Sequence, residues 1–94
     1  MSEEKDTVER QTLLQFPCQF PIKIMGRDHA AFHDAARSIV SRHADDVTDD
    51  VIRQSASRKG NFAALTITIE ATSQQQLDDI YRDLSSHEEI LVAL

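Results

Sequence analysis

The segment SRKGNFAALTITIEAT, residues 57–72, contains the most strand-like run in the chain. From Phe62 to Ala71, apolar side chains alternate with small or polar ones, and β-branched residues fill the middle of the run. Because successive side chains of a strand point to opposite faces, this alternation predicts a strand with one covered face. The residues that we expect on the covered face are Ala63, Leu65, Ile67 and Ile69.

The polar start of this segment, Arg58-Lys59-Gly60-Asn61, has two interpretations. In the first it is the turn of a hairpin, because glycine adopts the left-handed backbone conformation that short hairpins require. In the second, Arg58 and Lys59 form a loop that faces an anion, either a carboxylate or a phosphate. The segment is not a P-loop, because it lacks the preceding glycine, the Lys-Ser/Thr ending and the helix that follows such a loop.

A second alternating run, CQFPIKIMG, covers residues 18–26. Phe20, Ile22 and Ile24 share one face, which predicts a strand over residues 20–25. Pro21 has no N–H to donate, so we expect the strand to begin near it or to have a gap there. Gly26 follows the run, and we expect it to end the strand and to permit a sharp exit.

Two amphipathic helices are predicted. The first covers residues 28–44 and is capped by Asp28, whose carboxylate can accept hydrogen bonds from backbone N–H groups. Its covered residues are Phe32, Ala35, Ala36, Ile39, Val40 and His43. The second begins after a cap at Thr72 or Ser73. Its apolar residues are Leu77, Ile80, Tyr81 and Leu84.

The remaining segments complete the order strand, helix, strand, strand, helix, strand. Residues 51–58 predict a polar edge strand, and residues 90–94 a short final strand. The fold class is therefore α+β: a ferredoxin-like βαββαβ sandwich with a four-stranded antiparallel sheet and two helices on one face. Residues 1–11 are expected to be a mobile tail, and residues 12–94 a single domain. The open sheet face is expected to present Lys23, Met25, Thr66, Thr68 and Glu70.

Composition restricts the partners. The 94 residues include 10 basic and 16 acidic side chains, for a formal net charge of −6. Phosphate backbones are bound by clustered Lys and Arg, so this balance argues against nucleic acids and anionic membranes. No apolar run approaches the ~20 residues of a membrane helix. The single cysteine, Cys18, cannot close an internal disulfide, and we expect a cytoplasmic protein.

Few residues suggest chemistry. His29 and His33 are four residues apart and could share a helix face, as two metal ligands do, but no third ligand or H-E-x-x-H pattern accompanies them. The alternative is a pair of surface histidines. Cys18 has no base near it in the sequence to form a thiolate, which favours a structural thiol. We expect no catalytic residue, metal or cofactor.

Three segments, LLQFPCQFPIKIMG, SRKGNFAALTITIEAT and ILVAL, resemble the YbeD-like family of small bacterial proteins. The resemblance runs from about Leu13 to Leu94. It implies a ferredoxin-like fold similar to the ACT-type regulatory domains, and a genomic neighbourhood that often includes lipoate-biosynthesis genes. It brings no catalytic residues.

The expected function is that of a small non-enzymatic regulatory or adaptor domain, which binds either a small anionic metabolite or a protein partner such as an enzyme or a second copy. ACT-type domains hold their ligands at the strand-to-helix turn, which is Gly26-Arg27-Asp28 here. The expected ligand-binding residues are Gly26, Arg27, Asp28, Arg58, Lys59, Gly60 and Asn61.

The alternative is a small hydrolase that acts on acyl or phosphoryl groups, with Arg27 binding the anion. It requires Arg27 to lie near a group such as Asn61 that could position a nucleophile. These two residues belong to different predicted loops.

Overall fold

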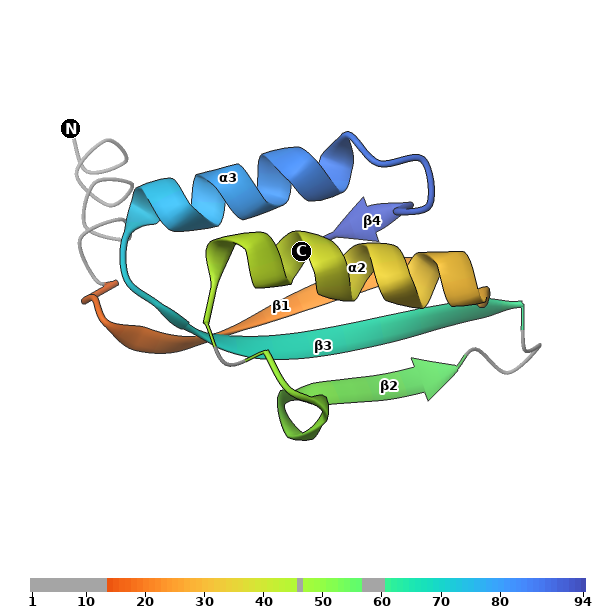
Figure 1. The fold of residues 1–94 in the computed structure, drawn as a ribbon, viewed down its shortest axis with the longest axis horizontal. Coiled ribbons are helices and arrows are strands. Elements are labelled where there is room, and N and C mark those ends of the chain that lie inside the picture. The colour runs from red at the N-terminus through yellow and green to blue at the C-terminus, as the bar shows by residue number, and fades with distance from the viewer. Residues whose placement is uncertain (1–13, 46, 57–60) are drawn as a thin grey trace, which may run out of the picture.

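The computed structural model describes residues 14–45, 47–56 and 61–94. The strands are β1 (Cys18–Arg27), β2 (Ile52–Ala56), β3 (Phe62–Ala71) and β4 (Val92–Ala93). The helices are α2 (Ala30–His43), the short 3-10 helix η1 (Asp49–Val51) and α3 (Gln74–Ser85). Within this described part of the chain, the strands form one antiparallel sheet in the order β2-β3-β1-β4 (Figure 1).

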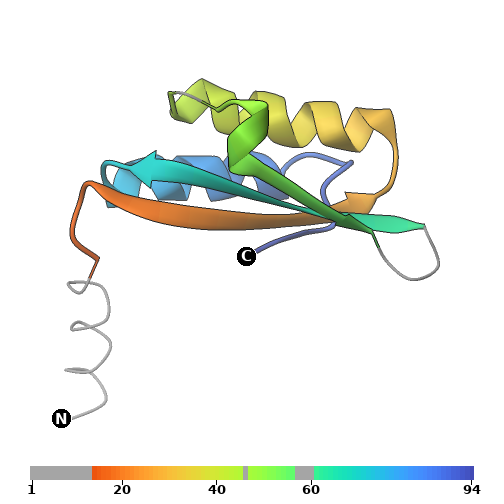
Figure 2. The same cartoon turned by 90° about the horizontal axis from the view of Figure 1, so that it is seen from below.

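Helices α2 and α3 cover the same face of the sheet (Figure 2). No helix or strand of the described residues covers the opposite face, which we call the open face. The predicted ferredoxin-like α+β arrangement is confirmed, and so is the central position of β1 and β3. Ile22 and Ile67 are register partners on these two strands, and both are fully buried. Phe32, Ile39 and Val40 of α2, with Leu77, Ile80 and Leu84 of α3, cover them.

Pro21 lies inside β1, which contradicts the prediction that the strand would begin near it or have a gap there. β1 pairs with β3 without interruption from Cys18 to Arg27. The N–H of Lys23 donates to Leu94 on the β4 side, 3.1 Å away. Alternate residues of a strand direct their N–H groups to the same edge, so an N–H of residue 21 would also point to the β4 side of β1. The two residues of β4 do not extend as far as Pro21, so the missing N–H leaves no strand partner unpaired there.

Helix α2 begins two residues later than predicted, at Ala30, and the prediction that Asp28 caps it is wrong. His29 occupies the cap position with no capping hydrogen bond from its side chain. Asp28 instead accepts a hydrogen bond from the ring of His33, with Oδ1 2.9 Å from Nε2. The Asp28 carboxylate therefore contacts the first turn of the helix through the His33 side chain, and it caps no backbone N–H group.

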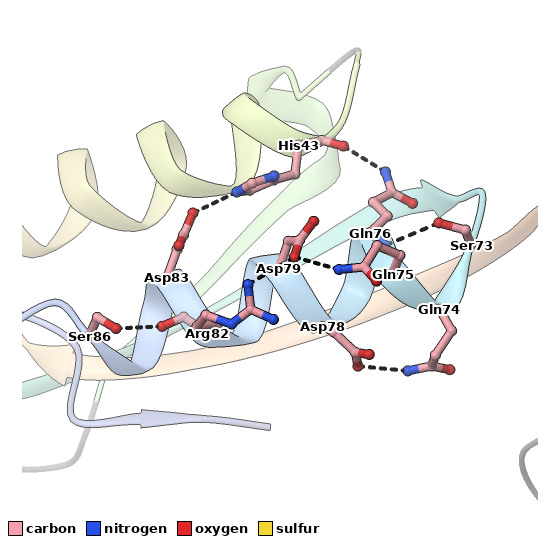
Figure 3. Close-up of polar contacts among 10 residues, drawn as sticks. All are labelled: His43, Ser73, Gln74, Gln75, Gln76, Asp78, Asp79, Arg82, Asp83 and Ser86. Carbon is pink, nitrogen blue, oxygen red and sulfur yellow. Dashed lines mark hydrogen bonds and ion pairs between the residues drawn. The ribbon is translucent and has the colours of Figure 1, made fainter.

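Helix α3 has the predicted cap. The Ser73 hydroxyl accepts a hydrogen bond from the Gln76 N–H at 3.0 Å. The Gln76 side chain donates to the carbonyl oxygen of His43 at 2.7 Å, and the His43 ring lies 2.6 Å from the Asp83 carboxylate. Figure 3 shows these contacts joining the end of α2 to α3. The two helices are thus fixed to each other as well as to the sheet.

Replacing Ser73 with alanine should lower the free energy of unfolding by about 1 kcal/mol, since the Gln76 N–H loses its acceptor. Urea denaturation followed by circular dichroism measures this change. Ser41→Ala is the matched control, because Ser41 is an exposed residue inside α2 where alanine favours the helix. Equal stabilities of Ser73→Ala and Ser41→Ala would show that the cap contributes nothing.

The bounds of the two outer strands differ from the predicted ones within the described residues. β2 covers Ile52–Ala56 of the expected 51–58, and residues 57–60 lie outside the described part. β4 covers only Val92–Ala93 of the expected 90–94, because Ile90 turns into the core. The predicted tail, residues 1–11, also lies outside the described residues. None of the described helices has the length and apolar composition needed to cross a bilayer.

Candidate functional site

The turn between β1 and α2 lies beside the start of β3. Arg27 and Phe62 are register partners, and the Asp28 N–H donates to the carbonyl oxygen of Asn61 at 3.1 Å. Of the predicted ligand-binding residues, Arg27, Asp28 and Asn61 are therefore neighbours. Arg58, Lys59 and Gly60 were predicted to join them and lie outside the described residues.

Gly26 serves packing at this turn. It lies within β1 rather than ending it, and it is buried. The Phe32 ring and the Glu89 carbonyl group occupy the space that a side chain would need. The expectation that Gly26 ends the strand with a special backbone conformation is therefore wrong, and its requirement for glycine is steric.

Arg27 is the exposed cation of this turn. It lines a shallow depression of about 330 Å³ together with His29, Asn61 and Phe62. Asp28 beside it is engaged by His33. Arg27, at the end of β1, and Asn61, just before β3, thus lie close together, as the hydrolase interpretation requires.

The histidine and cysteine candidates stay apart. Among the described residues, no group of three or more His, Cys, Asp or Glu side chains is arranged to hold a metal ion. The His33 ring contacts the Asp28 carboxylate, and His29 lines the depression that contains Arg27 and Asn61. Cys18 is half-buried against the core at the start of β1.

The open face of the sheet carries the largest exposed apolar side chains. The register places Ala64, Met25 and Val92 in one row across β3, β1 and β4, and Phe62 follows in the next row of β3. Leu91 lies at the end of this row, where its N–H donates to the Met25 carbonyl oxygen. We call Met25, Phe62, Ala64, Leu91 and Val92 the apolar patch. They line a depression of about 410 Å³.

Exposure distinguishes the apolar patch from the rest of the sheet. Phe62, Leu91 and Val92 are 46%, 54% and 41% exposed, and Leu94, the backbone partner of Lys23 next to the patch, is 64% exposed. The apolar residues on the helix-covered face are nearly all buried. Polar residues of the open face, such as Thr66 and Thr68, continue toward the other end of the sheet. The patch therefore occupies the end of the open face nearest the β1–α2 turn.

Basic side chains flank the apolar patch. On one side Arg53, Thr66 and Lys23 form the next row across β2, β3 and β1. On the other side Arg27 pairs with Phe62. Among the described strand residues on this face, the one carboxylate is Glu70, near the opposite end of β3. The patch thus has cations at two edges, while Glu88 and Glu89 line a depression with Arg27 and Leu91 beside it.

The end of the chain is attached to this face by Tyr81. Its hydroxyl donates to the carbonyl oxygen of Leu94 at 2.8 Å, and Leu94 and Lys23 exchange two backbone hydrogen bonds of 2.8 and 3.1 Å. Burial raises the pKa of Tyr81 above its usual value of 10.0, because ionisation would place a charge in a poorly solvated position. Through its hydrogen bond to Leu94, Tyr81 supports β4, the short strand that contains Val92.

We expect Tyr81, the only tyrosine, to ionise at a higher pH in the folded protein than in the guanidinium-unfolded chain. Because the unfolded state ionises first, the free energy of unfolding should fall as pH rises from about 10 through the folded pKa. Absorbance of the tyrosinate measures both titrations. Identical midpoints in the folded and unfolded chains would refute the burial of this hydroxyl.

Part of this surface was predictable from the sequence. Lys23, Met25, Thr66, Thr68 and Glu70 were predicted on the open face, and the register confirms this. The contributions of Phe62, Leu91 and Val92 were not predicted. An unbroken apolar run such as ILVAL has no alternation from which to assign faces.

Known proteins resemble the whole domain. A family model described as "Protein of unknown function (DUF493)" matches residues 11–94. A UPF0250 protein of Chromobacterium violaceum is 46% identical over 88 residues, which cover 92% of this chain and 97% of the relative. A UPF0250 protein of Paraburkholderia phytofirmans is 42% identical over 84 residues, covering 89% and 94%. A UPF0250 protein of Neisseria gonorrhoeae is 40% identical over the full length of both chains.

One solved structure is similar in fold. The solution structure of protein HP0495 from H. pylori superimposes with a TM-score of 0.59, over 86% of this chain and 85% of that one. The two sequences are 10% identical, so the similarity concerns the fold alone.

Proposed function

This chain belongs to the DUF493 family, as its resemblance to the YbeD-like proteins predicted, and we propose that it is a non-enzymatic adaptor domain that binds a partner protein through the open face of its sheet. The observation that carries the proposal is the apolar patch. Exposed apolar groups gathered at one place, and bordered by polar residues, are typical of a protein-binding surface.

The architecture supports this role. A sheet face is commonly covered by a second layer of secondary structure, and here, in the part of the chain that the structure describes, helices cover one face only (Figure 2). Val92 and Leu91 extend the patch to the edge of the sheet beside β4. A partner helix laid over this end would bury the patch and complete a third layer.

Affinity capture with quantitative mass spectrometry tests the proposal. The wild-type protein should retain specific partners from a bacterial lysate, and Val92→Asp should lose them, because a carboxylate would be buried in the contact. Ala31→Asp is the matched control: it adds the same charge at an exposed position on α2. Equal capture by wild type and Val92→Asp would refute this use of the open face.

A second candidate function rests on Arg27 and Asn61, which line the same depression. Their proximity is compatible with a small carboxylate or phosphate ligand, and with the acyl- or phosphoryl-group hydrolase in which Arg27 binds the anion. Titration with a panel of carboxylate metabolites should then move the amide resonances of residues 26–30. Arg27→Ala should abolish these shifts and any hydrolase activity of the wild type. A wild type without either response would exclude both versions.

A further inference from the structure

We propose that the segment bound on the open sheet face is an amphipathic helix whose apolar stripe is flanked by Asp or Glu. This inference rests on the proposed adaptor function and adds the chemistry of the partner. It follows from the position of the cations around the apolar patch.

The cations and the patch form parallel rows across the sheet. Successive rows of one face lie about 7 Å apart, because they are two residues apart along each strand. Lys23 and Arg53 therefore lie one row from Met25 on one side, and Arg27 lies one row from it on the other. All three basic side chains belong to exposed residues. A helix seated on the patch would bring its flanking side chains to these rows.

The cations stand out against the rest of the chain. The protein has 16 acidic and 10 basic residues, so an average part of its surface is expected to carry more carboxylates than cations. The helices on the opposite face carry exposed carboxylates, including Asp34 and Asp78. The same helices also expose Arg37, Arg42 and Arg82, so the helix layer is mixed in charge. The open face, where basic side chains flank the apolar patch, thus favours a negatively charged partner.

A single-stranded nucleic acid or a second copy of this chain fits the apolar patch less well. Proteins that bind single-stranded nucleic acid stack several bases on aromatic side chains. Phe62 is the one aromatic residue among the described strand positions of the open face. A second copy would have to offer an acidic apolar helix. In the described helices α2 and α3, the apolar residues instead pack into the core, and the carboxylates lie on the polar sides.

Synthetic peptides test the inference directly. The probe is an 18-residue helical peptide with leucines along one face and glutamates beside them; two matched peptides carry glutamine or lysine instead. Titration into the ¹⁵N-labelled protein at low salt should move the amide resonances of Met25, Ala64 and Val92. The glutamate peptide should bind at least tenfold more tightly than the glutamine peptide, and the lysine peptide should not saturate.

Charge reversals identify the cations responsible. Lys23→Glu and Arg53→Glu should each weaken binding of the glutamate peptide at least fivefold and strengthen binding of the lysine peptide. Arg42→Glu is the matched control, because it changes the net charge equally from an exposed position on the last turn of α2. Equal effects of all three variants would show that only net charge matters, and would overturn the inference.

Other outcomes also decide between partners. Equal binding of the glutamate and glutamine peptides, or a response of the patch resonances to single-stranded oligouridine alone, would overturn the acidic partner. So would a dimer in sedimentation that Val92→Asp dissociates, since a second copy would then cover the patch. If no peptide binds but Val92→Asp still loses captured proteins, the acidic partner is refuted and the adaptor function stands.

Discussion

Gly26→Ala will destabilise the protein by about 3 kcal/mol, and Gly26→Val will leave little folded protein. A Cβ at this position would lie 2.6 Å from the carbonyl oxygen of Glu89, and closer still to the ring of Phe32. The ring is fully buried and the carbonyl belongs to the backbone, so neither can move aside without displacing the chain around it. For a domain of this size the melting temperature should fall by roughly 10–20 °C.

Thermal unfolding followed by circular dichroism measures the effect. Ser55→Thr is the matched control, because it adds one methyl group to an exposed position of edge strand β2 and should stay within about 0.5 kcal/mol of wild type. A stable Gly26→Ala variant would contradict the steric argument. If the Gly26→Ala variant were stable but no longer bound a ligand that the wild-type protein binds, Gly26 would be part of a ligand site, as predicted from the sequence.

The strands that alternate were predictable, and so was their order. β3 was expected at residues 62–71 and has these bounds, because each of its buried residues is separated from the next by one facing the open side. β1 was predicted at 20–25 and extends further, to Cys18 and Arg27. Propensity places Pro21 near a strand end, whereas the sheet accommodates it inside because its ring faces an unpaired edge. That edge depends on the length of β4, which the sequence pattern does not encode.

The candidate site was less predictable than the fold. The adjacency of Arg27 and Asn61 follows from the pairing of β1 with β3, and a register is a long-range property. The cap of α2 was assigned to Asp28 on residue preference alone, but the backbone turns one residue later, at His29. The apolar patch was missed because Leu91 and Val92 belong to a run in which every residue is apolar. Only the register with Met25 assigns Val92 to the open face.

The isoleucines that face the helices provide a graded test of the architecture. Ile52, Ile67 and Ile22 form one row across β2, β3 and β1. Ile67 and Ile22 are fully buried, whereas Ile52 on the edge strand is only partly buried. Ile67→Ala and Ile22→Ala should each lower the free energy of unfolding by about 4 kcal/mol, through lost burial and the cavity left behind. Ile52→Ala should cost about 1 kcal/mol, because solvent already reaches that position.

Guanidinium denaturation of the three alanine variants measures this gradient, and Ile67→Val, expected at about 1 kcal/mol, checks that the loss scales with the atoms removed. The gradient follows from position alone, since the three residues are identical and share one row. A cost for Ile52→Ala equal to that of Ile67→Ala would mean that β2 is covered like the centre of the sheet. A small cost at Ile22 and Ile67 would mean that the helices do not cover β1 and β3, and the open face could then no longer be assigned to the opposite side.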